Sequence, residues 1–236
     1  MRGLVIMAMF LASFADAAWN DYKTVRELRL DASGIESFEI DAGAGEMGVQ
    51  GVVGLEAIEV VATIVVPESN EDDAMELVEK KLRLSLHSAG DRARLVSHFK
   101  PGVFGNESAA RIDLEIMVPS GLAIEIDDGS GSIDLVDLGG DVSIEDGSGS
   151  ITVAGVAGLS IDDGSGSIDV SSAAGDVSIV DGSGSIKVRS VAGSVTIDDG
   201  SGSIKVNDVA QDLIIVDDGS GGFSYADVRG SVKDDS

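Results

Sequence analysis

The chain has 236 residues, of which 42 are Asp or Glu and 16 are Lys or Arg, so its formal net charge is −26. This charge argues against a nucleic-acid partner, because phosphates need a basic footprint, and against binding to anionic lipid. Hydrophobic residues make up 43% of the chain, which argues against a disordered acidic chain and indicates a folded core.

Residues 1–17 have the pattern of a secretory signal peptide. Arg2 supplies the positive charge, residues 4–12 form the apolar run, and residues 15–17 read Ala-Asp-Ala, a small-residue cleavage site. An uncleaved membrane anchor is the rival interpretation, but it needs about 20 apolar residues. We therefore expect an exported protein, in the periplasm or at the cell surface, with no membrane-spanning segment after cleavage. The chain contains no Cys, so its fold does not depend on disulfides.

Residues 40–49 contain a Gly-x-Gly-x-x-Gly sequence after a strand-like stretch, which is the spacing of the dinucleotide-binding fingerprint. That fingerprint requires a helix next, whereas residues 49–54 are poor helix formers. The segment aligns instead with the later repeats, with Gly43 on Gly129. We interpret it as a diverged first coil and reject the nucleotide site.

Residues 57–121 depart from the repeat. We expect a strand, a helix, a hairpin and another strand here, at residues 57–66, 70–81, 82–99 and 111–118. Asn70 is a good helix N-cap, and Lys80 and Lys81 give the helix a basic last turn. Residues 117–121 then form the turn into the first regular coil. Such an excursion can cover the open end of a solenoid, whose strand edges would otherwise be exposed.

From residue 127 the sequence repeats Asp-Gly-Ser-Gly-Ser-Ile almost unchanged. The Gly after the Asp recurs at intervals of 18, 17, 18, 18 and 19 residues, and a second turn follows each one 11 residues later. A flexible Gly/Ser linker would not keep this phase, whereas a solenoid requires a fixed period.

Within each repeat, β-branched residues alternate with polar ones, as in Val142-x-Ile144 and Ile151-x-Val153. This alternation between Gly-rich turns predicts two short strands per repeat. One repeat cannot bury its apolar side chains, but coils stacked in parallel at about 4.8 Å can. An antiparallel meander is the alternative, but it gains nothing from identical residues at a fixed period. We predict an all-β fold, a narrow parallel β-solenoid with 17–19 residues per coil, with the N-terminal strand, helix and hairpin as its cap.

The Asp before each Gly forms a further column, namely Asp128, Asp146, Asp163, Asp181, Asp199 and Asp218. Stacked carboxylates about 4.8 Å apart repel one another, so the column needs compensation. In one interpretation each carboxylate accepts N–H groups of the following Gly-Ser-Gly turn. In the other, Ca²⁺ lies between neighbouring turns. We favour the structural turn and keep calcium as the alternative; we expect no other cofactor.

No catalytic constellation is expected. His87 and His98 lack a metal-ligand spacing, and the repeat serines have no His close to them in the repeat. Paired carboxylates such as Asp162 and Asp163 occur in carbohydrate-processing β-helices, but adjacent strand residues point to opposite faces. We therefore expect a non-enzymatic envelope interaction or adhesion module that presents a regular acidic surface to an envelope protein or glycan. A calcium-binding repeat protein is the alternative, and a polysaccharide-processing enzyme is a remote one.

Residues 36–233 resemble a family of exported bacterial proteins called "putative adhesins". The resemblance rests on Val118-Pro119-Ser120-Gly121, on the Asp-Gly-Ser-Gly-Ser-Ile turns and on the Val-Ala-Gly second turns. It implies a β-solenoid at the cell envelope and transfers no catalytic residues. We divide the chain into a signal peptide (1–17), a diverged first coil with its capping excursion (18–121) and the regular repeats (122–236), with one continuous structural domain over 36–233.

Overall fold

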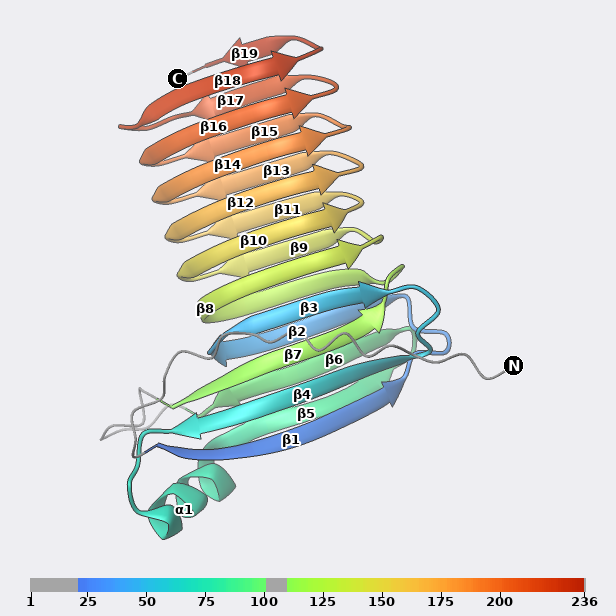
Figure 1. The fold of residues 1–236 in the computed structure, drawn as a ribbon, viewed down its shortest axis with the longest axis vertical. Helices are drawn as coiled ribbons and strands as arrows, with labels where there is room; N and C mark the ends of the chain where they lie inside the picture. The colour runs from blue at the N-terminus through green and yellow to red at the C-terminus, as the bar shows by residue number, and fades with distance from the viewer. Residues whose placement is uncertain (1–20, 101–109, 236) are drawn as a thin grey trace.

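The computed structural model describes residues 21–100 and 110–235. The predicted signal peptide at residues 1–17 lies outside these ranges. Strands make up 70% of the structure and helix 5%, and the strands stack into a parallel β-solenoid of about 6 turns with about 18 residues per coil. Figure 1 shows the stack as a tall column with its only labelled helix, α1, at the N-terminal end. The predicted fold class is confirmed.

The N-terminal part contains seven strands and one helix among the described residues. They are β1 (Tyr22–Asp31), β2 (Ser37–Ala44), β3 (Met47–Val52), β4 (Ala57–Val66), α1 (Glu71–Lys81), β5 (Leu82–Ala89), β6 (Arg92–Phe99) and β7 (Arg111–Pro119). Asn70 caps α1, because its side chain accepts the backbone N–H groups of Asp72 and Asp73. The strand β1 was not predicted from the sequence.

The regular coils follow, and each contributes a longer and a shorter strand. These strands are β8 (Ala123–Leu138), β9 (Val142–Asp146), β10 (Gly149–Val156), β11 (Leu159–Asp163), β12 (Gly166–Ala173), β13 (Val177–Asp181), β14 (Gly184–Val191), β15 (Val195–Asp199), β16 (Gly202–Val209), β17 (Leu213–Asp217), β18 (Gly222–Val228) and β19 (Val232–Asp234).

The strands form two faces, which we call sheet A and sheet B. Sheet A runs β1-β4-β7-β3-β8-β10-β12-β14-β16-β18. Sheet B runs β5-β6-β2-β8-β9-β11-β13-β15-β17-β19. The long strand β8 turns the Asp-Gly-Ser-Gly corner without a break, so its first half lies in sheet B and its second half in sheet A. Every regular coil repeats this corner.

The first coil, formed by β2 and β3, is inserted between two later segments. In sheet B, β2 pairs in parallel with β6 on one side and β8 on the other. In sheet A, β3 pairs with β7 and β8 in the same way. Met47 lies opposite Ile133 and Ala42 opposite Asp128, which is the alignment expected for a diverged coil. The chain therefore lays down the first coil and returns to enclose it from both sides.

The core is a set of apolar columns in which like residues stack on like. Ile151 lies between Ile133 and Ile168 in register, and all three are at most 1% exposed. Fully burying one such side chain contributes about 1.5–3 kcal/mol. Because each coil adds the same few side chains, most of the stability comes from contacts between neighbouring coils.

At each corner, the second Gly of Asp-Gly-Ser-Gly stacks directly on its equivalent in the preceding coil. A Cβ atom built on Gly149, Gly166, Gly184 or Gly202 would lie 1.5–1.6 Å from the carbonyl oxygen of that preceding Gly. No side chain fits at this distance, so the repeated Gly is a requirement of backbone packing.

The second turn carries a pattern that repeats every two coils. One position, stacked along the solenoid, reads Asp141, Gly158, Asp176, Ser194, Asp212 and Ser231. Each Asp accepts the backbone N–H of the residue in the next coil, at 2.9, 2.8 and 2.8 Å, and Asp212 also accepts the Ser231 hydroxyl. Successive coils are thus joined in pairs at this turn.

We expect Gly184→Ala to destabilise the protein by about 3–5 kcal/mol, because the new methyl group would overlap a backbone carbonyl that cannot move away. Gly121→Ala is the matched control, because a Cβ there has no atom within 4 Å, and it should change stability by less than about 0.5 kcal/mol. Urea unfolding followed by circular dichroism measures both. Equal losses would contradict the packing role of the corner Gly.

Removal of residues 182–199 should leave a folded protein that is one coil shorter, because Asp181 then joins Gly200 in the same phase of the repeat. Removal of residues 182–190 should instead abolish cooperative unfolding, because it exchanges sheet A and sheet B for every later residue. Melting curves by circular dichroism compare the two deletions. Similar melting of both proteins would be incompatible with the stacked coils.

Candidate functional site

The six predicted site aspartates lie at the corner of the solenoid, and five of them point into it. Asp128, Asp146, Asp163, Asp181 and Asp199 are 4, 6, 2, 2 and 0% exposed, and consecutive members lie opposite each other in sheet B. We call these five residues the aspartate row. Each occupies the third inward position of its strand, after two apolar residues, as in Val142-x-Ile144-x-Asp146.

The sixth residue, Asp218, differs from the others. It belongs to the last coil, where the pairing of β15 with β17 shifts register by one residue after Ile197. Its side chain is half-buried, and the extra residue of the 19-residue interval causes the shift. Asp218 therefore lies next to the row, beside Asp199, but is not enclosed like the other five.

The two oxygens of each row carboxyl have different surroundings. Oδ1 of Asp146, Asp163, Asp181 and Asp199 accepts the backbone N–H of the Ser two residues later, at 3.0–3.2 Å. This contact belongs to the Asx type of turn. Oδ2 of all five residues is buried and has no hydrogen-bond partner in the described structure.

Burial makes the charged form of the row unfavourable. Desolvation, with the neighbouring Asp146 as the second cause, raises the pKa of Asp128 to about 7. Desolvation also raises the pKa of Asp181 to about 6, although the N–H of Ser183 opposes the shift. The pKa values of Asp146, Asp163 and Asp199 are raised for the same main reason.

The described residues contain no group of three or more His, Asp and Glu side chains arranged to hold a metal ion. Calcium between the row carboxyls thus stays a prediction. Ca²⁺ takes six to eight oxygen ligands, and the row presents one free oxygen per coil.

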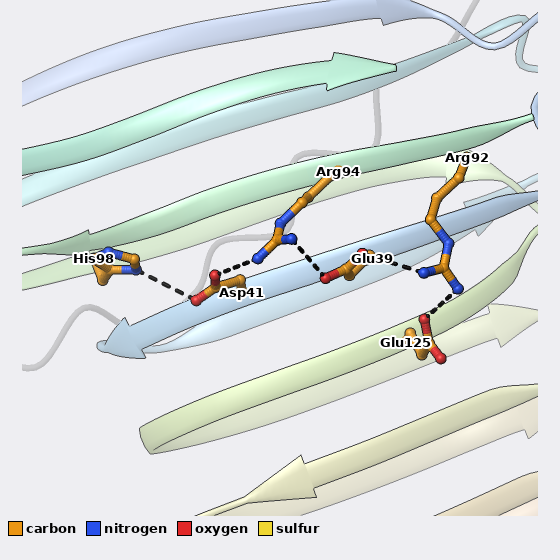
Figure 2. Close-up of polar contacts among 6 residues, drawn as sticks. All are labelled: Glu39, Asp41, Arg92, Arg94, His98 and Glu125. Carbon is orange, nitrogen blue, oxygen red and sulfur yellow. Dashed lines mark hydrogen bonds and ion pairs between the residues drawn. The ribbon is translucent and has the colours of Figure 1, made fainter. Parts of the chain in front are cut away.

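A second polar feature covers the outer face of sheet B near the N-terminal end. Figure 2 shows a chain of ion pairs across β6, β2 and β8. Arg94 contacts Glu39 at 3.3 Å and Asp41 at 2.8 Å, while Arg92 contacts Glu39 at 3.5 Å and Glu125 at 2.8 Å. His98 Nδ1 extends the chain by lying 3.3 Å from Asp41. We call these six residues the ion-pair network; it links the inserted first coil to both of its neighbours.

Farther along, the outer face of sheet B becomes a regular array of hydroxyl and carboxylate groups. One column holds Ser143, Ser160, Ser178 and Thr196, and the next holds Asp127, Glu145, Asp162, Val180 and Asp198. A shallow groove of about 760 Å³ runs beside the hydroxyl column, lined by residues that include Arg92, Glu125, Asp141, Ser143, Ser160 and Asp176. We call this surface the sheet B face.

Sequence reasoning placed the aspartates in one column but missed their burial, and it missed the ion-pair network. The burial could have been found, because each Asp stays in phase with the inward Val and Ile of its strand. The ion-pair network could not have been found from the sequence, because the pairing of β6 with β2 joins segments 53 residues apart. The predicted surface histidines are an exposed His87 on β5 and a half-buried His98 on β6.

No protein-family model matches the chain, and no curated protein matches it in sequence. Three solved structures similar to it are a "putative cell adhesion protein" from Clostridium sporogenes, a "putative lipid binding protein" from Parabacteroides distasonis and a "putative adhesin" from Bacteroides fragilis. Their sequence identities to this chain are 11, 14 and 14%, and their TM-scores are 0.35, 0.40 and 0.31. Each match covers 90% of this chain and 100, 94 and 97% of the other chain, respectively. Among the residues that the structure describes, no helix is long and apolar enough to span a bilayer.

We expect Arg94→Met to lower the melting temperature at low salt, because it removes the two ion pairs that Arg94 forms from β6 to Glu39 and Asp41 on β2. The loss should shrink toward 1 M salt, where the screening length falls to about 3 Å. Arg26→Met on β1 is the control, because among the described residues the hydrogen bonds of the Arg26 guanidinium go to its neighbours Thr24 and Val25. If both variants lose the same amount at every salt concentration, the network does not hold the inserted coil.

Proposed function

We propose that the protein is a non-enzymatic interaction or adhesion module of the bacterial envelope that binds its partner along the sheet B face. The observation that carries the proposal is the regular array on that face, where a hydroxyl column and a carboxylate column run side by side over successive coils. Neighbouring coils are about 4.8 Å apart, so the same pair of groups recurs at a fixed interval, except on β13, where Val180 stands in the place of the acid.

The chemistry of the face suits an extended partner with many donors. Ser and Thr hydroxyls both donate and accept hydrogen bonds, while carboxylates accept only. Among the described residues, Glu145, Asp162 and Asp198 form no ion pair with Lys, Arg or His, so their charge is available to a partner. Asp127 lies close enough to Arg94 to help raise the pKa of that guanidinium. A glycan rich in hydroxyl or amino groups, or a basic stretch of an envelope protein, meets these requirements; an anionic polymer does not.

The test measures binding of the purified chain to immobilised envelope glycans and to proteins of an envelope extract. The triple variant Glu145→Gln, Asp162→Asn, Asp198→Asn should weaken binding by roughly tenfold, as expected from losing three surface contacts of about 0.5 kcal/mol each. The control Glu27→Gln, Glu115→Gln, Asp134→Asn changes the net charge equally but alters exposed acids of sheet A, and should bind as the unchanged protein does.

Equal weakening by both triple variants would show that net charge, and not the sheet B face, governs binding. Absence of binding to every glycan and extract protein would count against the adhesion proposal. Release of reducing ends from any polysaccharide would instead favour the enzyme alternative.

A further inference from the structure

The aspartate row is unusual because it places five acidic groups inside the regular coils, whose other buried residues among those described are apolar. The row residues are at most 6% exposed. The turn hydrogen bonds of Asp146, Asp163, Asp181 and Asp199 involve Oδ1. The Asx turns therefore leave the Oδ2 atoms of all five row residues buried without a partner. A buried polar atom without a partner is costly, and an ionised one more so.

The surroundings of the row offer no compensating positive charge. The carboxylates nearest to it are Asp127, Asp162, Asp198, Asp217 and Asp218. Glu145 lies on the outer face of β9, and Asp41 lies on the outer face of the neighbouring strand β2. Below Asp128 the column continues with Ala42 and then with Ser97, whose buried Oγ also lacks a partner. In the described part of the chain no Lys, Arg or His pairs with a row carboxyl. The charged side chains that shift the pKa values of the row are all Asp residues, and each of them raises the cost of ionising it.

Two kinds of cation could neutralise such a row, and the enclosure of the site distinguishes them. Ca²⁺ needs six to eight oxygen ligands, often including water, whereas each Oδ2 atom is sealed from solvent. A proton needs only one carboxyl oxygen to carry it, and it removes the charge that burial makes unfavourable. Protonation of one carboxyl also relieves the repulsion on the neighbouring carboxyls of the row, which are stacked in register with it.

We propose that the aspartate row is a proton-binding device in which some carboxyls stay protonated near neutral pH, and that the solenoid gains stability as the surroundings become acidic. The elevated pKa values of Asp128, about 7, and Asp181, about 6, agree with the geometry. The protons belong to the row as a whole, because interacting carboxyls titrate together.

The direction of the effect follows from proton linkage. An unfolded Asp titrates near pH 3.9, so between about pH 4 and pH 7 the folded protein holds more protons than the unfolded one. The stabilisation is fully present below the unfolded pKa and is lost as the pH rises through the folded values. The exposed Asp212 changes stability with pH in the opposite direction, because its hydrogen bonds from Ser231 lower its pKa. Its contribution to stability is lost as the pH falls.

The test compares the dependence of the melting temperature on pH in two double variants of the full chain. Asp163→Asn, Asp181→Asn replaces two buried carboxyls, and should raise the melting temperature near pH 8 and flatten its rise between about pH 8 and pH 4. Asp162→Asn, Asp198→Asn removes the same charge from outward-facing residues of β11 and β15. This control lowers the repulsion on Asp163 and Asp199 but leaves every buried carboxyl in place, so it should keep most of the steep dependence. If the melting temperature depends on pH with the same slope in both variants, the proposal is overturned, because general repulsion between surface charges would then explain that dependence.

A second measurement needs no variant and covers the case in which Asn disturbs the fold. Carbon NMR of the Asp side chains in the unchanged protein should show several carboxyls that remain protonated above about pH 5, where ordinary Asp is ionised. Full ionisation of every Asp below that pH would refute the proposal that the aspartate row carries protons. A saturable rise in melting temperature with millimolar calcium near pH 8, lost in the buried double variant, would show that a metal ion and not a proton occupies it.

Discussion

The stacking of one corner backbone directly on the next is the contact on which the rest of the structure depends. At this corner a Gly approaches the carbonyl of the preceding Gly too closely for any side chain. The close approach keeps the coils in register, so all the remaining positions of a coil are also stacked on their equivalents in the next coil. For Ile and Val this repetition is favourable, since like shapes pack well. For the inward Asp it is unfavourable, because the same register brings one carboxyl above another.

The N-terminal end solves a different problem, which is how to finish a stack that would otherwise leave two strand edges open. Antiparallel strands replace parallel ones there, with β4 on β7 and β5 on β6, and α1 follows at the end of the column in Figure 1. The inserted first coil gives this end many contacts between residues far apart in sequence, as between β2 and β6. Such contacts close long loops and slow folding. The ion-pair network of Figure 2 spans this region, and joins its three strands side by side.

The sequence predicts the repeated part well because a fixed period and a fixed alternation leave few choices. The strands of the regular coils, the cap at Asn70 and the hairpin of β5 and β6 follow from local patterns. The insertion of the first coil and the pairing of β1 with β4 do not, since nothing local to β1 or β2 identifies a partner strand. The burial of the aspartates can be predicted, because each Asp is in phase with the inward Val and Ile of its strand. The same Asp residues are also typical of turns, in which the side chain bonds to the backbone, and that pattern alone does not predict burial. Calcium binding by these aspartates stays a prediction.

The alternation at the second turn has a consequence for how this solenoid can change length. Because Asp141, Asp176 and Asp212 each bond to the coil that follows, the natural module is a pair of coils and not a single one. Gain or loss of two coils preserves the alternation, whereas gain or loss of one brings two Asp, or two small residues, into neighbouring coils. Relatives that differ in length should therefore differ most often by even numbers of coils. Whether the number of coils is even or odd then reflects whether the repeat was duplicated in pairs.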